Sequence, residues 1–460
     1  MVKLLKQEEN KIKHSRDSEY DLVVIGGGPG GMAAAVKAAE LGVERVLLIE
    51  RDSFLGGILP QCIHSGFGIK IFNSELTGPE YCQLFVEKVR NISIEVMLDT
   101  MALALDLKGG KKSIIVSSRN FGIKRITAEA IILSLGCKER TRGQILIPGS
   151  RPAGVLTAGL VQRMVNIEGL LPGKNILILG SGDIGLIMAR RLVLEGCNVK
   201  GVFELMPFST GLLRNISQCL EDFEIPLYLS HTVTKIYGDK RIESVDIAMV
   251  DKNLKPIQSK TKNIVCDTLL LSVGLIPENE LSKTGEIEID LKTGGPAVDQ
   301  YLHTSQNGVF ACGNSLFVND LVDNVTEDGY LAAQSAVSFL NGSLMGKKPI
   351  RGEKLMRSKK PMRGEKLINI EAGENIAYIV PQKVSGKSDV NFRIRASTPL
   401  RNAFIEFSNT GLKKKVRFVN PGELIFAKIT KNDFGKFLER NTKSASDNIK
   451  VSIKKEVQGV

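Results

Sequence analysis

Two glycine clusters in this chain have the spacing GxGxxG, which suits a turn that wraps a pyrophosphate. The pattern positions are filled by Gly26, Gly28 and Gly31 in the first cluster and by Gly180, Gly182 and Gly185 in the second. One glycine makes the tight bend, one lets backbone N–H groups reach the phosphates, and one lets helix and strand pack closely. The positive end of the following helix also favours a phosphate. Each cluster therefore predicts a site for an adenine dinucleotide.

An acidic residue follows each cluster at a corresponding place. Segments 20–50 and 175–204 both have the order strand, glycine turn, helix, strand, and they end in Glu50 and Glu204. A carboxylate there accepts hydrogen bonds from the ribose hydroxyls of the adenosine and repels a 2′-phosphate. Glu204 thus favours NAD over NADP. Taken alone, each motif could instead be a structural glycine turn that binds no dinucleotide. The presence of two complete copies makes this alternative weaker.

The segments around the two clusters predict an α/β fold. Apolar runs such as 21–25 and 175–179 are typical of buried parallel strands, and the Ala-rich segment 32–41 favours a helix. The two clusters lie about 150 residues apart, which is the length of one domain. We expect two Rossmann-like domains, one inserted into the other, followed by a small β-rich domain.

These features resemble the flavoproteins with two dinucleotide-binding domains, which include thioredoxin reductase, glutathione reductase and bacterial NADH oxidases. The resemblance covers the chain from residue 20 to about residue 340. Segment 304–314 is similar to the late family motif T…GxFAxGD, with Asn314 in place of its Asp. Gly136 and Gly274 end segments similar to the family's two crossovers between domains. The resemblance implies that FAD binds at the first cluster and NAD at the second.

The site residues follow from the motifs together with this resemblance. For FAD they are Gly26, Gly28, Gly30, Gly31, Glu50, Arg51, Gly57, Gly136, Gly313, Asn314 and Thr326. For NAD they are Gly180, Gly182, Asp183, Ile184, Gly185, Glu204 and Gly274. We expect the last helix of the first domain at about residues 325–340, with Asp320, Asp323 and Thr326 just before it. By the resemblance its N-terminus faces the flavin, although an ordinary helix cap would use the same residue types.

The cysteines depart from the disulfide-reducing members of the family. The chain has seven cysteines, none paired as CxxC or CxxxxC, and Leu59 and His64 stand at the two places of the family's redox pair. Cys62, between them, cannot form an intrachain dithiol alone, so we expect neither direct disulfide reduction nor a metal site. His64 is a candidate to tune the flavin or shuttle a proton, with a structural histidine as the alternative. Cys62 is the weaker catalytic candidate, because a small packing residue explains it better.

Segment 61–68, together with segment 76–80, resembles a narrower branch of the family. That branch comprises the flavoprotein subunits encoded beside bacterial glycerol-3-phosphate dehydrogenases. More distantly it includes subunits of sarcosine oxidase, dye-linked proline dehydrogenase and opine oxidase. The resemblance implies an electron-transfer subunit that works with a substrate-oxidising dehydrogenase subunit, in a homo- or hetero-oligomer. Two alternatives remain open, a standalone NADH oxidase or disulfide-type reductase, and an assembly subunit in which FAD is structural.

Composition sets the remaining expectations. The net charge is +12, and all of the excess falls after residue 340, which suits an acidic partner or a solvated basic surface. Neither a signal peptide nor an apolar run of membrane-spanning length is apparent, and no nucleic-acid motif occurs, so we expect a cytoplasmic protein. The expected units are a charged tail (1–19), an FAD-binding domain (20–148 and 277–345), an NAD-binding domain (149–276), a basic linker with a twelve-residue duplication (346–368) and a basic β-rich domain (369–460).

Overall fold

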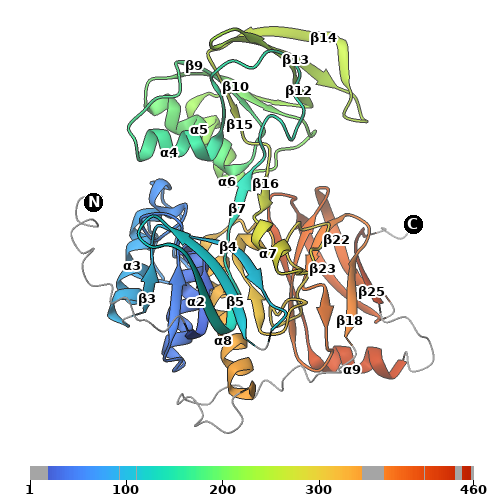
Figure 1. The fold of residues 1–460 in the computed structure, drawn as a ribbon. Coiled ribbons are helices and arrows are strands. Elements are labelled where there is room, and N and C mark those ends of the chain that lie inside the picture. The colour runs from blue at the N-terminus through green and yellow to red at the C-terminus, as the bar shows by residue number, and fades with distance from the viewer. Residues whose placement is uncertain are drawn as a thin grey trace.

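The computed structural model describes residues 19–92, 94–109, 111–343, 367–408, 410–440 and 448–456. Most of the expected tail and of the duplicated linker lies outside the described residues. The described chain forms three regions, each with its own apolar core or cores (Figure 1). We call them the first domain, the inserted domain and the C-terminal domain. The mixed α/β fold predicted from the sequence is confirmed.

The first domain is built on a seven-stranded sheet. In spatial order its strands are β3 (Glu95–Met97), β2 (Val46–Ile49), β1 (Glu19–Ile25), β6 (Gly122–Leu133), β5 (Lys112–Ser118) and β4 (Thr100–Asp106), with β17 (Val309–Ala311) beside β6. β2, β3, β6 and β17 each run parallel to β1 or to one of its neighbours. β1, β2 and β17 are mostly buried, as expected for strands covered on both faces.

Helices cover this sheet and set the position of the first glycine turn. They are α2 (Pro29–Glu40), α3 (Gly78–Asn91), α7 (Glu280–Thr284), α8 (Val322–Ser343) and the short 3₁₀ helices η1 (Leu59–Gln61) and η3 (Gly313–Ser315). α2 and α8 pack so closely that a Cβ on Gly329 would clash with the backbone oxygen of Gly30. The turn before α2 is therefore fixed between β1 and α8.

The start of α8 corrects one expectation. The sequence predicts this helix at about residues 325–340, after Asp323 and Thr326, whereas α8 begins at Val322 and contains both residues. The Asp323 carboxylate accepts a hydrogen bond from the backbone N–H of Lys70 at 2.9 Å. An acid in the first turn of a helix is favoured by the helix dipole, so Asp323 extends the helix rather than preceding it.

The inserted domain repeats the plan on a five-stranded parallel sheet. Its strands are, in order, β11 (Leu227–Leu229), β10 (Asn198–Glu204), β9 (Asn175–Leu179), β15 (Thr268–Leu271) and β8 (Val155–Thr157). Its helices are α4 (Ala158–Asn166), α5 (Asp183–Leu194), α6 (Leu213–Cys219) and η2 (Glu221–Phe223), and a three-stranded antiparallel sheet consists of β12 (His231–Gly238), β13 (Ile242–Val250) and β14 (Pro256–Val265).

A two-stranded ribbon joins the first and inserted domains. It pairs β7 (Cys137–Glu139) with β16 (Leu275–Pro277) in antiparallel register (Figure 1). Gly136 and Gly274 each precede one of these strands with a positive φ, of 72° and 103°. Both crossings of the chain therefore run through one narrow connection.

The C-terminal domain is rich in β-structure, as predicted. One sheet orders β20 (Lys383–Val384), β18 (Ile368–Ala372), β25 (Asn448–Lys455), β22 (Leu400–Phe407) and β23 (Leu412–Val419), and the other orders β19 (Ile376–Val380), β21 (Val390–Ala396) and β24 (Leu424–Ile429). The inward side chains of both sheets share one core that includes Phe392 and Phe407. A helix, α9 (Lys431–Arg440), was not expected from the sequence.

Candidate dinucleotide-binding site

One large cavity runs between the domains and reaches both glycine turns. Its volume is about 1890 Å³, and its wall includes Gly26 and Gly28 at one end and Gly180 and Gly182 at the other. Both acids that follow the turns, Glu50 and Glu204, also border it. The two motifs, distant in the sequence, therefore open into a common space.

In the first turn, the backbone geometry explains the glycines. Gly26 has a φ of 105°, which residues with a Cβ rarely adopt. Gly28 is the N-cap of α2, and a Cβ placed on it would meet nothing closer than 4.0 Å, so it lies open to the cavity. The Glu50 carboxylate accepts hydrogen bonds from the N–H groups of Gly27 at 2.6 Å and Asp52 at 2.8 Å. Burial raises the pKa of Glu50.

The second turn has the same arrangement of glycines and acid, with one added hydrogen bond to the acid. Gly180 has a φ of 96°, and Gly182 is the N-cap of α5. The Glu204 carboxylate accepts from the N–H groups of Ser181 at 2.8 Å and Met206 at 2.9 Å, and from the Ser181 hydroxyl at 2.6 Å. The acid at each turn is thus held by backbone donors on the turn itself and just beyond the strand end.

These residues fit an adenine dinucleotide at each turn. A glycine N-cap carries no side chain that could accept from the first N–H groups of the helix. Gly30 of α2 and Asp183 and Ile184 of α5 border the cavity, so their N–H groups suit a phosphate. Pro29 has no N–H, and the N–H of Gly185 donates to the Ser272 hydroxyl at 3.1 Å. Each carboxylate retains lone pairs for ribose hydroxyls, because an ionised carboxylate offers about four acceptor positions.

Most of the predicted residues border this cavity, but some do not. The bordering set is Gly26, Gly28, Gly30, Glu50, Arg51, Gly57, Gly136, Asn314, Gly180, Gly182, Asp183, Ile184, Glu204, Gly274, Cys62 and His64. Gly31 and Gly185 instead pack against the turn and the neighbouring strand end, where a Cβ would clash. Gly313 and Thr326 are also set back, and the Thr326 hydroxyl pairs with that of Tyr81 at 2.7 Å. Val322 and Val325 of α8 line the cavity in their place.

The segment that carries His64 and Cys62 lies between the first and inserted domains. The Gln61 amide donates to the backbone oxygen of Gly159 at 2.9 Å, and Asn166 donates to the backbone oxygen of Gln61 at 2.8 Å. His64 lines the cavity, with Nδ1 2.9 Å from the oxygen of Ser65. Burial lowers the pKa of His64 and raises that of the Cys62 thiol to about 12. Cys62 is therefore held as a neutral thiol.

Asn314 is the residue to which the resemblance assigns a contact with the flavin chain. It borders the cavity, its Oδ1 accepts from the N–H of Asn319 at 3.0 Å, and its amide nitrogen lies 3.6 Å from the sulfur of Cys137.

All seven cysteines are free. Within the described residues, no group of His, Cys, Asp and Glu could hold a metal ion. No helix of that part is long and apolar enough to cross a membrane.

One wall of the cavity is not predicted by any sequence motif. The C-terminal domain contributes Tyr378, Arg395, Pro421 and Gly422. No local motif marks these residues, because their role depends on contacts with segments far away in the chain.

The two glycine turns, the acid at each turn and the shared cavity define a protein of the class with two dinucleotide-binding domains. The family described as pyridine nucleotide-disulphide oxidoreductase matches residues 20–337, and the chain belongs to this family. The chain is thus an oxidoreductase of a family whose members bind FAD and NAD(P). The C-terminal domain lies beyond the matched residues.

Curated relatives are distant. The chain is 27% identical to hydrogen cyanide synthase subunit HcnB of Pseudomonas protegens over 62% of each chain. It is 23% identical to one of the opine oxidase subunits of Agrobacterium tumefaciens, over 70% of this chain and 66% of that one. The chain thus spans just under two-thirds of the length of these relatives.

Among solved structures, the thioredoxin reductase of T. acidophilum has the same fold over most of the chain. Its TM-score is 0.58 at 23% identity, and the match covers 71% of this chain and 99% of that one. A thioredoxin reductase of Lactococcus lactis gives a TM-score of 0.58 at 22% identity, over 70% of this chain and 99% of that one. These likenesses concern the fold of the first and inserted domains.

Proposed function

We propose that this chain binds FAD at the first glycine turn and NAD at the second, passes hydride between them, and works as the electron-transfer subunit of a dehydrogenase complex. The observation that carries the proposal is the single cavity that joins the two turns, with a buried, hydrogen-bonded glutamate at each end. When bound, the nicotinamide and the flavin supply the hydride chemistry. The chain supplies the binding, the orientation and the exclusion of water.

A preference for NAD is part of the proposal. Glu204 is only 5% exposed, and its carboxylate is fixed by Ser181 and Met206. The next two residues, Leu205 and Met206, offer no positive charge to a 2′-phosphate. A 2′-phosphate would therefore meet a carboxylate that cannot swing away.

The role in a complex rests on two relatives whose names describe subunits, HcnB of hydrogen cyanide synthase and the opine oxidase relative. The partner we propose is a protein that oxidises a small organic substrate, of the glycerol-3-phosphate dehydrogenase type. The basic C-terminal region suits docking on an acidic surface of such a partner. Cys62, with a buried thiol and a raised pKa, weakens the alternative of a standalone disulfide reductase.

The test is spectroscopic. The purified chain should carry FAD, or take it up, and NADH should bleach the oxidised flavin in the absence of oxygen more readily than NADPH does. In air without a partner, turnover of NADH should be slow. Fast steady consumption in air would instead support a standalone oxidase, and a flavin that NADH leaves oxidised would support a structural role. A colourless chain unable to take up FAD would overturn the proposal.

His64 is proposed to act near the flavin, because it lines the cavity and burial lowers its pKa, which favours the neutral imidazole. Replacement of His64 with Ala should alter the flavin absorption spectrum and the rate of reduction by NADH. If both are unchanged, His64 is structural.

A further inference from the structure

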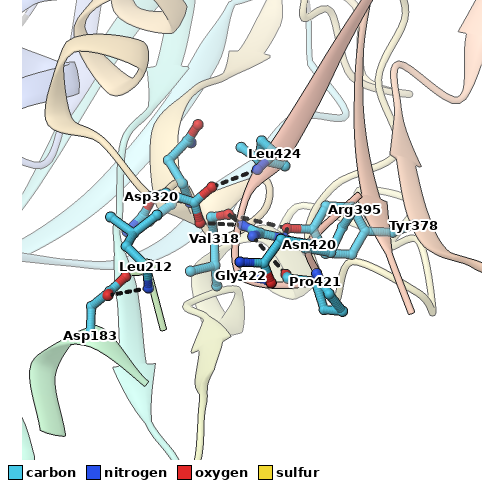
Figure 2. Close-up of polar contacts among 12 residues, drawn as sticks. Asp183, Leu212, Val318, Asp320, Tyr378, Arg395, Asn420, Pro421, Gly422 and Leu424 are labelled. Atoms are coloured by element: carbon cyan, nitrogen blue, oxygen red, sulfur yellow. Dashed lines mark hydrogen bonds and ion pairs between the residues drawn. The ribbon is translucent and has the colours of Figure 1, made fainter. Parts of the chain in front are cut away.

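The three domains meet at one side of the cavity. Figure 2 shows Asp320 and Val318 of the first domain beside Arg395, Tyr378 and the turn 420–422 of the C-terminal domain, with Asp183 and Leu212 of the inserted domain nearby. The segment that carries Val318 and Asp320 directly precedes α8. The second glycine turn is thus approached by a domain that lies outside the matched family region.

Arg395 ties the C-terminal domain to the first domain. Its guanidinium pairs with the Asp320 carboxylate at 2.5 Å and donates to the backbone oxygens of Val318 and Pro421, both at 3.1 Å. The other Asp320 oxygen accepts from the N–H of Leu424 at 2.8 Å. The Arg395 side chain is only 12% exposed. Its Nε donates to the Tyr378 hydroxyl at 3.1 Å. Four acceptors on three segments are therefore held by one planar donor group, which lysine could not replace.

The turn that Arg395 holds abuts the inserted domain. A Cβ on Gly422 would lie 2.6 Å from the backbone oxygen of Thr210 and 3.0 Å from that of Gly211. The backbone of Gly422 is not in the left-handed region, so the close approach is what requires glycine there. The N–H of Gly422 donates to the side chain of Asn420 at 3.0 Å, which keeps the turn compact.

The touched loop is in turn bonded to the second glycine turn. The N–H of Thr210 donates to the Ser181 hydroxyl at 3.0 Å, and the N–H of Leu212 donates to the Asp183 carboxylate at 2.8 Å. A Cβ on Gly211 would lie 2.7 Å from the backbone oxygen of Ser181. A continuous path of contacts therefore runs from Asp320 through Arg395 and Gly422 to the residues that surround the proposed NAD site.

We propose that Arg395 and Gly422 are positioning residues, through which the C-terminal domain holds the inserted domain in the orientation that opens both glycine turns into one cavity. The chain itself joins the first and inserted domains through the narrow β7–β16 ribbon. A rotation about this ribbon would separate the turns. The hydrogen bonds of Gln61 with Gly159 and Asn166 oppose it directly between the two domains, and the packing of Gly422 against Thr210 adds a contact from the C-terminal domain. The expected effect on the rate of flavin reduction rests on the proposed hydride transfer. The expected effect on the position of the loop 210–212 does not.

The test compares Gly422→Ala with Gly435→Ala in the full chain. A Cβ on Gly435 meets nothing within 4 Å, and this residue lies in α9, away from the cavity. Gly422→Ala must displace the loop 210–212, so amide hydrogen exchange at residues 209–213 should accelerate while FAD content stays unchanged. The limiting rate of flavin reduction by NADH should fall about tenfold, because small displacements of reacting groups cost large factors in rate. Gly435→Ala should change neither the hydrogen exchange at residues 209–213 nor the rate of flavin reduction.

Arg395→Lys provides a second, independent variant. It keeps the charge but loses the forked contacts, so it should accelerate exchange in the same loop. Combined with Gly422→Ala it should add little, because both residues act on one path. Unchanged exchange in both single variants, or faster exchange without slower flavin reduction, would overturn the inference. If NADH does not reduce the wild-type flavin, the proposed function fails, and the exchange result alone decides whether the C-terminal domain holds this loop.

Discussion

The two glycine turns share a frame and differ in what closes them. At the first, Glu50 is held by backbone donors alone, and the cover comes from α8 of the same domain, with Val325 beside Gly30. At the second, Glu204 also accepts from the Ser181 hydroxyl, and the cover is the loop 210–212 backed by the C-terminal domain. The first turn is covered by a helix of its own domain. The cover of the second turn depends on contacts that link the inserted, C-terminal and first domains.

This difference suggests a division of labour between the turns. A site enclosed by elements of one packed domain opens only with local unfolding of that domain, which suits a ligand that stays bound. A site whose covering loop is backed by another domain can open by a rigid-body movement at that interface, which suits a ligand that must exchange. The first arrangement fits FAD and the second fits NAD.

The largest expected effect comes from filling the two equivalent N-caps. Gly28 and Gly182 have φ values of −70° and −67°, so the backbone allows a larger residue at both, and both border the cavity. A Cβ at Gly28 would meet nothing closer than 4.0 Å, and one at Gly182 would lie 3.3 Å from the Ser272 hydroxyl. Gly28→Val should yield a chain that retains its fold but no flavin. Gly182→Val should keep the flavin and raise the apparent Kd for NADH about a hundredfold, because the phosphates lose their close approach to the backbone.

Flavin absorbance after gel filtration and a titration with NADH measure these outcomes, and circular dichroism checks the fold. Loss of flavin in Gly182→Val with its retention in Gly28→Val would reverse the assignment of the two turns.

The turns could be predicted from the sequence because their requirements are local. The need for glycine at Gly26 and Gly180 follows from a bend between strand and helix, and the acids follow from the next strand end. The fold could be predicted for the same reason, because buried strands such as β1 and β9 are continuous apolar runs in the sequence. α9 was missed although Thr430 and Asp433 form the capping pattern of a helix start, with the Asp433 carboxylate accepting from the Thr430 N–H at 3.0 Å.

The wall supplied by the C-terminal domain could not be predicted in this way. Asp320 and Arg395 lie 75 positions apart, and neither belongs to a motif. In the sequence, Gly422 resembles an ordinary turn glycine after Pro421, and only the packing against Thr210 shows why no other residue fits. Contacts of this kind depend on how domains pack, which periodicity and spacing do not encode.

The next largest effect concerns the choice between NADH and NADPH. Glu204→Gln removes the charge that repels a 2′-phosphate, so the ratio of kcat/KM for NADPH to that for NADH should rise about tenfold. Glu50→Gln is the matched control, because the same change at the first turn should loosen FAD without altering this ratio. Equal ratios in wild type and Glu204→Gln would show that another group makes the distinction.

A smaller effect should follow from Ser181→Ala, which makes the second turn more like the first. Ser181 is fully buried, and its hydroxyl donates to Glu204 at 2.6 Å and accepts from Thr210 at 3.0 Å. Loss of a hydrogen bond to a charged group costs about 1.5–3 kcal/mol, part of which the backbone donors offset. We expect the KM for NADH to rise about fivefold with FAD content unchanged. A change in FAD content instead would mean that a substitution at the second turn affects binding at the first.

The smallest effect tests the acid of the first turn through pH. Burial raises the pKa of Glu50, so its contribution to apo-protein stability is fully present below the ordinary carboxyl pKa and is lost as the pH rises through the raised value. The unfolding temperature of apo wild type relative to apo Glu50→Gln should therefore fall by about 2 °C as the pH rises from about 4 to about 7. Glu80 is the control with the opposite sign, because hydrogen bonds from Thr77 lower its pKa. Relative to Glu80→Gln, wild type should gain stability over the same range. If Glu50 behaved like Glu80, hydrogen bonds from the turn rather than burial would dominate its pKa in the apo-protein.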